Sequence, residues 1–183
     1  LFEHADRLLQ SLSARYQLAA LTNGNANVSI IGLDNYFSFA LTADEIDFGG
    51  GANSVSGTVD LTLAPATATA TIGIGGGAGT LDISDADIAA LADGFSSITI
   101  GDAAVGTGSV DIGSSTFADD VTIAGGLIVV TGLDAETNDV TLTARTAQII
   151  GNGGAEIDIT GGHVTLQTLA ATNGEIGTFN EKL

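Results

Sequence analysis

Two adjacent acids, Asp119 and Asp120, are of a residue type that can catalyse proton transfer. A pair of carboxylates can act as general acid and general base when both groups face the same reacting atom. These two acids lead into a strand-like segment, however, and neighbouring residues on a strand point to opposite faces. We therefore expect the two carboxylates to diverge, which favours a solvated strand entry over a catalytic pair.

A glycine-rich stretch at residues 153–160, GGAEIDIT, nearly matches a nonapeptide whose tandem copies bind calcium. Asp158 is its candidate calcium ligand. Glu156 stands where that motif has a glycine, and its Cβ obstructs the tight turn that exposes the carbonyl ligands. No tandem copy follows, so the stretch predicts a turn that leads into a strand, and we expect neither a metal site nor another cofactor.

Neither histidine has partners for catalysis. His4 lies in a helical pattern and His163 enters a strand, and neither has a cysteine, a second histidine or a serine at catalytic spacing. The sequence also contains no nucleophile elbow, phosphate-binding loop or dinucleotide motif. We therefore identify no catalytic residue.

The charge balance restricts the partners. The chain of 183 residues has 22 acids against 4 basic residues, a net charge of −18, which repels nucleic acid and anionic membrane surfaces. Cysteine is absent, no apolar run is long enough to span a membrane, and the acidic start does not resemble a signal peptide. Any export signal would lie outside this sequence.

One unit, residues 79–101, contains a strand, a turn of helix and a second strand. Leu81 and Ile83 alternate with a polar residue, Ser84 and Asp87 have the spacing of a capping box, and Gly94 is expected to end the helix. Similar alternating pairs recur along the chain, and we expect their apolar residues to form one core: Ile98, Ile100, Val110, Ile112, Val121, Ile123, Ile157 and Ile159. With 26 glycines and 5% aromatic residues, such thin layers favour a sheet-stacking solenoid of roughly 20 residues per coil.

The first part of the chain has a different pattern. Residues 1–16 have apolar side chains every three or four positions and predict an amphipathic helix. Residues 16–46, YQLAALTNGNANVSIIGLDNYFSFALTADEI, resemble a fragment of a haloacid dehalogenase-like hydrolase. The resemblance implies a cytoplasmic, magnesium-dependent phosphatase in which Thr22 and Asn23 bind a substrate phosphate. Nothing in the chain matches that family's nucleophile, and the only lysine is Lys182, so we expect no phosphate ester hydrolysis.

Residues 79–178 resemble the shaft repeats of filamentous haemagglutinin-like exoproteins and other bacterial surface adhesins, carried by ISDADIAALADGFSSITIG, VTIAGGLIVVTG and VTLTARTAQIIGNGGAEIDITGGHVTL. The resemblance implies a right-handed parallel β-helix that is exported to the cell surface. Other all-β folds remain open, as does a carbohydrate-active β-helix. Arg145, the one basic residue between Asp47 and Lys182, argues against acidic polysaccharide substrates.

We therefore predict a mainly β protein, a right-handed parallel β-helix preceded by a short α/β segment. The expected divisions are residues 1–47, which are hydrolase-like or a helical cap on the solenoid, a Gly/Thr/Ala-rich transition at 48–79, and solenoid repeats at 80–183. The expected function is structural or adhesive, without catalysis, on the bacterial surface or outside the cell. Expected partners are cell-surface ligands or glycans and, by end-to-end association, further copies; nucleic acid and membrane insertion are not expected.

Overall fold

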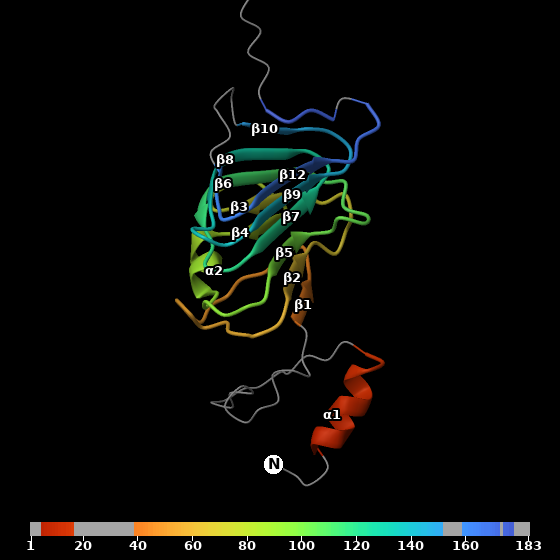
Figure 1. The fold of residues 1–183 in the computed structure, drawn as a ribbon, viewed down its shortest axis with the longest axis vertical. Helices are drawn as coiled ribbons and strands as arrows, with labels where there is room; N and C mark the ends of the chain where they lie inside the picture. The colour runs from red at the N-terminus through yellow and green to blue at the C-terminus, as the bar shows by residue number, and fades with distance from the viewer. Residues whose placement is uncertain (1–4, 17–38, 152–158, 173, 178–183) are drawn as a thin grey trace, which may run out of the picture.

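The computed structural model describes residues 5–16, 39–151, 159–172 and 174–177. Within them the protein is mainly β, as the alternating sequence pattern predicted, with short helices at two points (Figure 1). The elements are α1 (Ala5–Ser13), β1 (Phe39–Thr42), β2 (Leu61–Ala64), β3 (Ile72–Ile74), β4 (Leu81–Ile83), α2 (Asp85–Ala90), β5 (Ile98–Gly101), β6 (Val110–Thr116), β7 (Val121–Gly125), β8 (Ile128–Asp134), β9 (Val140–Ala144), β10 (Ile149–Gly151), β11 (Ile159–Thr160) and β12 (Val164–Thr168).

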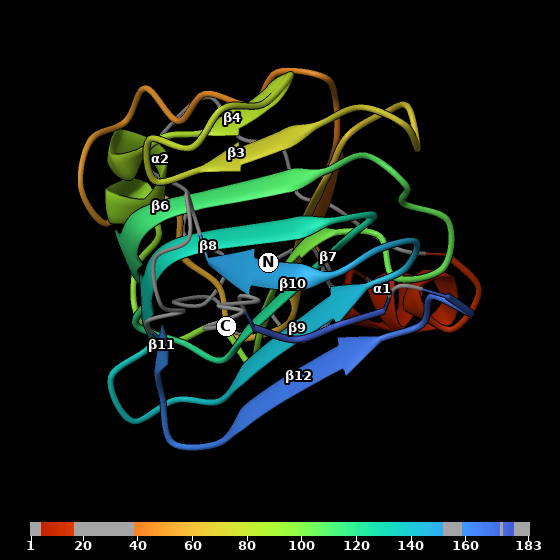
Figure 2. The ribbon, with the colours of Figure 1, turned by 90° about the horizontal axis from the view of Figure 1, so that it is seen from above.

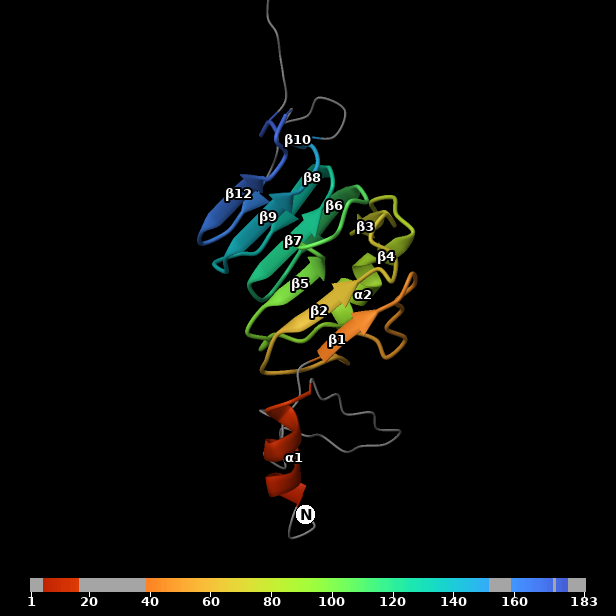
Figure 3. The same cartoon turned by 90° about the vertical axis from the view of Figure 1, so that its right-hand side faces the viewer.

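The strands form two parallel sheets. The first has the order β1-β2-β5-β7-β9-β12, and Figure 3 shows its strands stacked one above another from β1 to β12. The second has the order β10-β8-β6-β3-β4, with β11 paired to the far end of β8. From β5 to β10 the chain alternates between the sheets, so each strand pairs with the strand two places later in the sequence.

The core lies between the two sheets, whose strands Figure 2 shows from above. It consists of apolar side chains stacked in columns. Apolar residues occupy alternate strand positions, and successive side chains of a strand point to opposite faces, so one set turns inward. Because the pairing register places like positions opposite each other, these residues stack. The buried members in the first sheet are Leu61, Leu63, Ile98, Ile100, Val121, Ile123, Val140 and Leu142, and those in the second are Ile72, Ile74, Val110, Ile112, Ile128 and Val130.

Glycine makes the connection from β3 to β4 possible. The chain folds back over β3, and the Thr80 N–H donates to the Thr71 carbonyl at 2.9 Å. A Cβ on Gly79 would lie 2.0 Å from the Gly73 nitrogen, and a Cβ on Gly77 would lie 1.9 Å from the Asp111 carbonyl oxygen. Glycine is therefore required at these positions, because a side chain would prevent the two backbone segments from approaching so closely.

Helix α2 begins with the capping box that the sequence predicted. Ser84 is the N-cap, its hydroxyl accepts from the Asp87 N–H, and the Asp87 carboxylate accepts from the Ser84 N–H at 3.0 Å. The same carboxylate accepts from the Phe48 N–H at 2.8 Å, which fastens the segment after β1 to the helix. The helix ends at Ala90, before the predicted stop at Gly94, because Leu91 is already extended and pairs with Val55.

Most of the predicted inward residues are buried in one core. Ile159 is partly buried against this core, and Ile157 lies outside the described residues. The predicted first helix is present as α1. Strand β1, on the N-terminal side of the expected division at residue 47, pairs in parallel with β2 on its other side.

Candidate binding face

The outer face of the first sheet carries a column of five threonines. Each lies between two inward apolar residues of its strand, and the parallel register places each directly beside the next. Neighbouring strands are about 4.8 Å apart, so the column presents a hydroxyl and a methyl group at that repeat. Four members are half-buried and the last is exposed. This threonine column consists of Thr62, Thr99, Thr122, Thr141 and Thr165.

A second polar column precedes the same strands by one residue. Its members are Asp60, Ser97, Asp120, Asp139 and His163. The Ser97 hydroxyl lies 3.0 Å from Asp60 Oδ1, Asp120 Oδ1 accepts from the Asp139 N–H at 2.8 Å, and Asp139 Oδ1 accepts from the His163 N–H at 2.9 Å. This pre-strand column therefore fastens neighbouring strands together at their entry, and its carboxylates give the face a negative edge.

The opposite margin of the face is closed by loops. Gly101, Ala124 and Thr143 follow the threonine column by two residues and are buried. Beside them Arg145 Nη1 donates to the carbonyls of Ala103 and Ala104.

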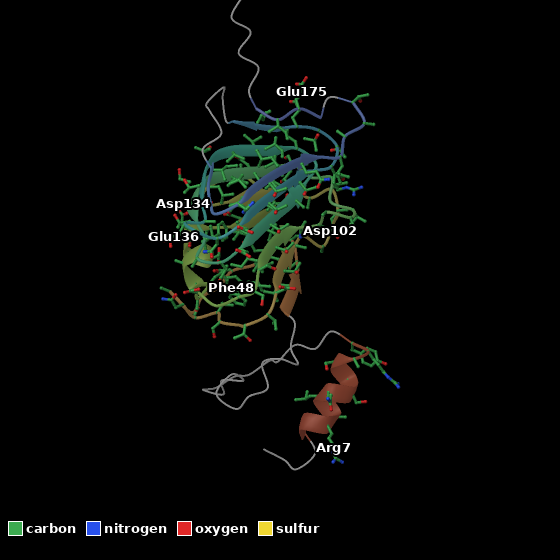
Figure 4. The ribbon with its side chains drawn as sticks, in the orientation of Figure 1. Arg7, Phe48, Asp102, Asp134, Glu136 and Glu175 are labelled. Carbon is green, nitrogen blue, oxygen red and sulfur yellow. The ribbon has the colours of Figure 1, made fainter. Side chains whose placement is uncertain are left out.

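A hollow of about 230 Å³ lies near this margin. Its lining is largely alanine and glycine, and the carboxylate of Asp102 there accepts from the N–H groups of Ala104 and Val105. The one carboxylate in the lining is thus already engaged by the protein's own backbone, so a polar ligand gains little from it. Figure 4 shows Asp102 on this side of the molecule, away from Asp134 and Glu136.

Asp119 and Asp120 diverge as expected. The Asp119 side chain is 6% exposed and Asp120 is exposed, because the two neighbours point to opposite faces. Burial raises the pKa of Asp119 above its ordinary value, and the nearby Asp93 carboxylate raises it further, whereas hydrogen bonds from the Gly94 and Phe95 N–H groups act in the opposite direction.

Asp119 lines a cavity of about 210 Å³ together with Ile88, Leu91 and Phe117. It accepts from the Gly94 N–H at 3.0 Å and so ties the turn after α2 to the strand entry of β7. The pKa of Asp119 is therefore raised first by burial and then by the neighbouring Asp93, while its hydrogen bond from the Gly94 N–H fixes the turn after α2.

Of the other predicted site residues, the structure describes His163. Thr22, Asn23 and Asp158 lie outside the described residues, so the phosphate and calcium predictions stay predictions. His163 is an exposed member of the pre-strand column. The threonine column was not predicted, although the sequence carries its signal: LTL, ITI, VTI, VTL and VTL recur at the start of five strands.

Among the described residues, no group of three or more His, Asp or Glu side chains is placed to hold a metal ion. No helix in that part of the chain is long and apolar enough to span a membrane. Comparison with known proteins returned no matching family model, curated protein or solved structure.

Proposed function

We propose that this chain is a segment of a right-handed parallel β-helix with a structural and adhesive role in an exported bacterial surface protein, without catalytic activity. The alternation of β5 to β10 between two parallel sheets supports the coil. The stacking of like side chains over five strands supports it as well. Parallel crossover connections are right-handed in about 98% of cases, which supports the hand.

Such a coil has a mechanical use. Every strand of the first sheet between β1 and β12 pairs with a strand on each side, so the main-chain hydrogen bonds run along the stack. Further coils add length without a new core design, because each coil repeats the same columns. A rigid, extendable shaft that lacks cysteine fits an exported surface protein whose stability comes from its sheet ladder.

The adhesive face is the outer side of the first sheet, and the threonine column is the observation that carries this assignment. The corresponding face of the second sheet is crossed by the glycine-rich connection, whose Ala78 N–H donates to the Asp111 carboxylate at 3.0 Å. A ligand for the threonine column must match a row of closely spaced hydroxyls beside carboxylates. An uncharged, hydroxyl-rich glycan of a cell surface meets these conditions, whereas an anionic polymer is repelled by the pre-strand column.

Adhesion can be measured with beads coated with the chain, applied to epithelial and bacterial cell layers and to an array of neutral and acidic glycans. We expect retention above that of albumin-coated beads and a preference for neutral glycans. The double variant Thr122→Glu, Thr141→Glu should reduce retention at least several-fold. Val129→Glu, at an outer position of the second sheet, is the matched control and should retain full binding once both variants are shown to be folded.

Retention no better than that of albumin would refute the adhesive role. Equal losses in the threonine variant and in Val129→Glu would refute the assignment of the face.

A further inference from the structure

A cavity of about 210 Å³ lies beside α2, on the side of the molecule away from Asp102 (Figures 1 and 4). Its floor consists of buried apolar side chains and one buried carboxylate, and its rim consists of exposed residues. The floor residues are Ile88, Leu91, Ile98, Phe117 and Asp119, and the rim residues are Asn53, Ala89, Thr116, Ala118 and Glu136. A concave, largely apolar hollow with a few polar groups is the usual form of a small-ligand site.

The charge of Asp119 distinguishes this cavity from an ordinary gap in packing. Phe117, Asp119 and Val121 are buried while the residues between them are exposed, so Asp119 occupies an inward position. An aspartate is rarely buried unless its charge is paired. Asparagine has the same shape and would accept from the Gly94 N–H without the cost of burying a charge. Fixing the turn therefore does not account for the carboxylate.

The protein supplies no counter-ion for this charge. Burial raises the pKa of Asp119 and the neighbouring Asp93 raises it further, and the groups that lower it are backbone N–H groups rather than basic side chains. Arg145 is the only arginine or lysine among residues 48–181, and its guanidinium donates to backbone carbonyls elsewhere. Glu136 adds a second carboxylate at the rim. The cavity is therefore negative and repels anionic ligands.

We propose that this cavity binds a primary alkylammonium group, with the ammonium beside the Asp119 carboxylate and the alkyl chain against the apolar floor. An apolar cavity of about 150 Å³ holds benzene, so about 210 Å³ suits a chain of roughly four to six carbons. A calcium ion is a poorer occupant, because it takes about six to eight oxygen ligands and the floor offers one carboxylate. The proposal does not depend on the adhesive role.

NMR titration of the full chain with n-pentylammonium tests the site, with n-pentanol and pentanoate as probes of matched length at equal ionic strength. We expect pentylammonium to shift the methyl signals of Ile88 and Leu91 saturably and to bind at least about tenfold more tightly than pentanol, because hydrogen bonds between charged groups are the stronger ones. Pentanoate should not bind. Equal affinity for pentanol, or no saturable shift with pentylammonium, would overturn the proposal.

Two pairs of variants locate the binding. Asp119→Asn keeps an acceptor for the Gly94 N–H and should weaken pentylammonium binding at least about tenfold. Asp120→Asn, at the exposed neighbour, should bind as the wild type does, which separates the site from diffuse attraction to an acidic surface. Ala89→Leu, which narrows the rim, should weaken binding, whereas Ala86→Leu, exposed on the same helix outside the cavity, should not. Equal affinities within either pair would overturn the proposal, and the alanine pair decides if Asp119→Asn does not fold.

Free alkylamines and lysine side chains share this chemistry, and Nα-acetyl-lysine methylamide separates them. It carries an ammonium on an alkyl stem, but its peptide groups must remain outside the cavity. Binding comparable to that of pentylammonium would assign the cavity to a lysine side chain of a partner protein, and binding of pentylammonium alone would assign it to a free alkylamine. Either result supports the proposal, and failure of both probes would refute it.

Discussion

Replacing Asp87 by alanine should destabilise the protein well beyond the effect of a surface substitution. Its buried carboxylate accepts three hydrogen bonds: from the Ser84 N–H at 3.0 Å, from the Ser84 hydroxyl at 2.6 Å and from the Phe48 N–H at 2.8 Å. The hydroxyl can turn to another acceptor, but the two backbone donors are left in partly buried positions. Because both donors are only partly buried, each costs about 1–2 kcal/mol, and alanine regains a few tenths in helix propensity, so we expect a loss of about 2–4 kcal/mol.

Urea unfolding followed by circular dichroism measures this loss, and for a chain of this length it corresponds to a fall in Tm of about 5–15 °C. Hydrogen exchange should show faster exchange of the Phe48 amide, since its acceptor is gone. Asp85→Ala, at an exposed acid in the first turn of the same helix, is the matched control and should lose much less. Equal losses in the two variants, with an unchanged Phe48 amide, would refute the assignment of Asp87 as the link between the helix and the segment after β1.

Three further predictions concern the glycine contact, the core and the buried acid. Gly79→Ala should destabilise strongly or prevent folding because its Cβ meets backbone at 2.0 Å, whereas Gly49→Ala, which has open space around it, should leave the thermal midpoint near that of the wild type. Ile100→Asp should cost about 3–5 kcal/mol in chemical unfolding because it buries an unpaired charge, and Thr99→Asp, at the neighbouring outward position, should cost far less. Since burial raises the folded-state pKa of Asp119, the folded state holds its proton more tightly than the unfolded state does. The stability contributed by this group is therefore full below its unfolded pKa and declines as pH rises through the folded one, and Asp119→Asn should remove that part of the decline in a pH series of unfolding curves.

The sequence was sufficient for the mainly β class and for the inward columns, because alternation of apolar and polar residues directly encodes the buried face of a strand. Ser84 and Asp87 were equally readable, since a capping box is a local interaction. Strand β10, Ile149–Gly151, was missed because it is short and Ile150 interrupts the alternation. The end of α2 was placed too late, since a pairing with the distant Val55 decides it.

The candidate face could not be predicted from the sequence because it depends on the register in which distant strands pair. A threonine between two apolar residues is ordinary in a single strand, and only the pairing of five strands turns it into a column. The glycine-rich connection after β3 has the composition of a linker, and the close approach of Gly77 to the Asp111 carbonyl depends on β6, which lies far along the chain. The pKa of Asp119 likewise depends on burial by elements from several parts of the sequence.

The stacking of the threonine column can be measured directly as a series of distances. The chain has no cysteine, so pairs of cysteines introduced at Thr62 and at Thr122, Thr141 or Thr165 carry spin labels at these sites alone. With excess unlabelled chain to suppress contacts between copies, dipolar spectroscopy should give separations that increase by one strand spacing per step, about 10, 14 and 19 Å before broadening by the label linkers. A shorter distance for Thr165 than for Thr122, or separations unrelated to strand order, would contradict the parallel in-register stack on which the proposed shaft and its binding face depend.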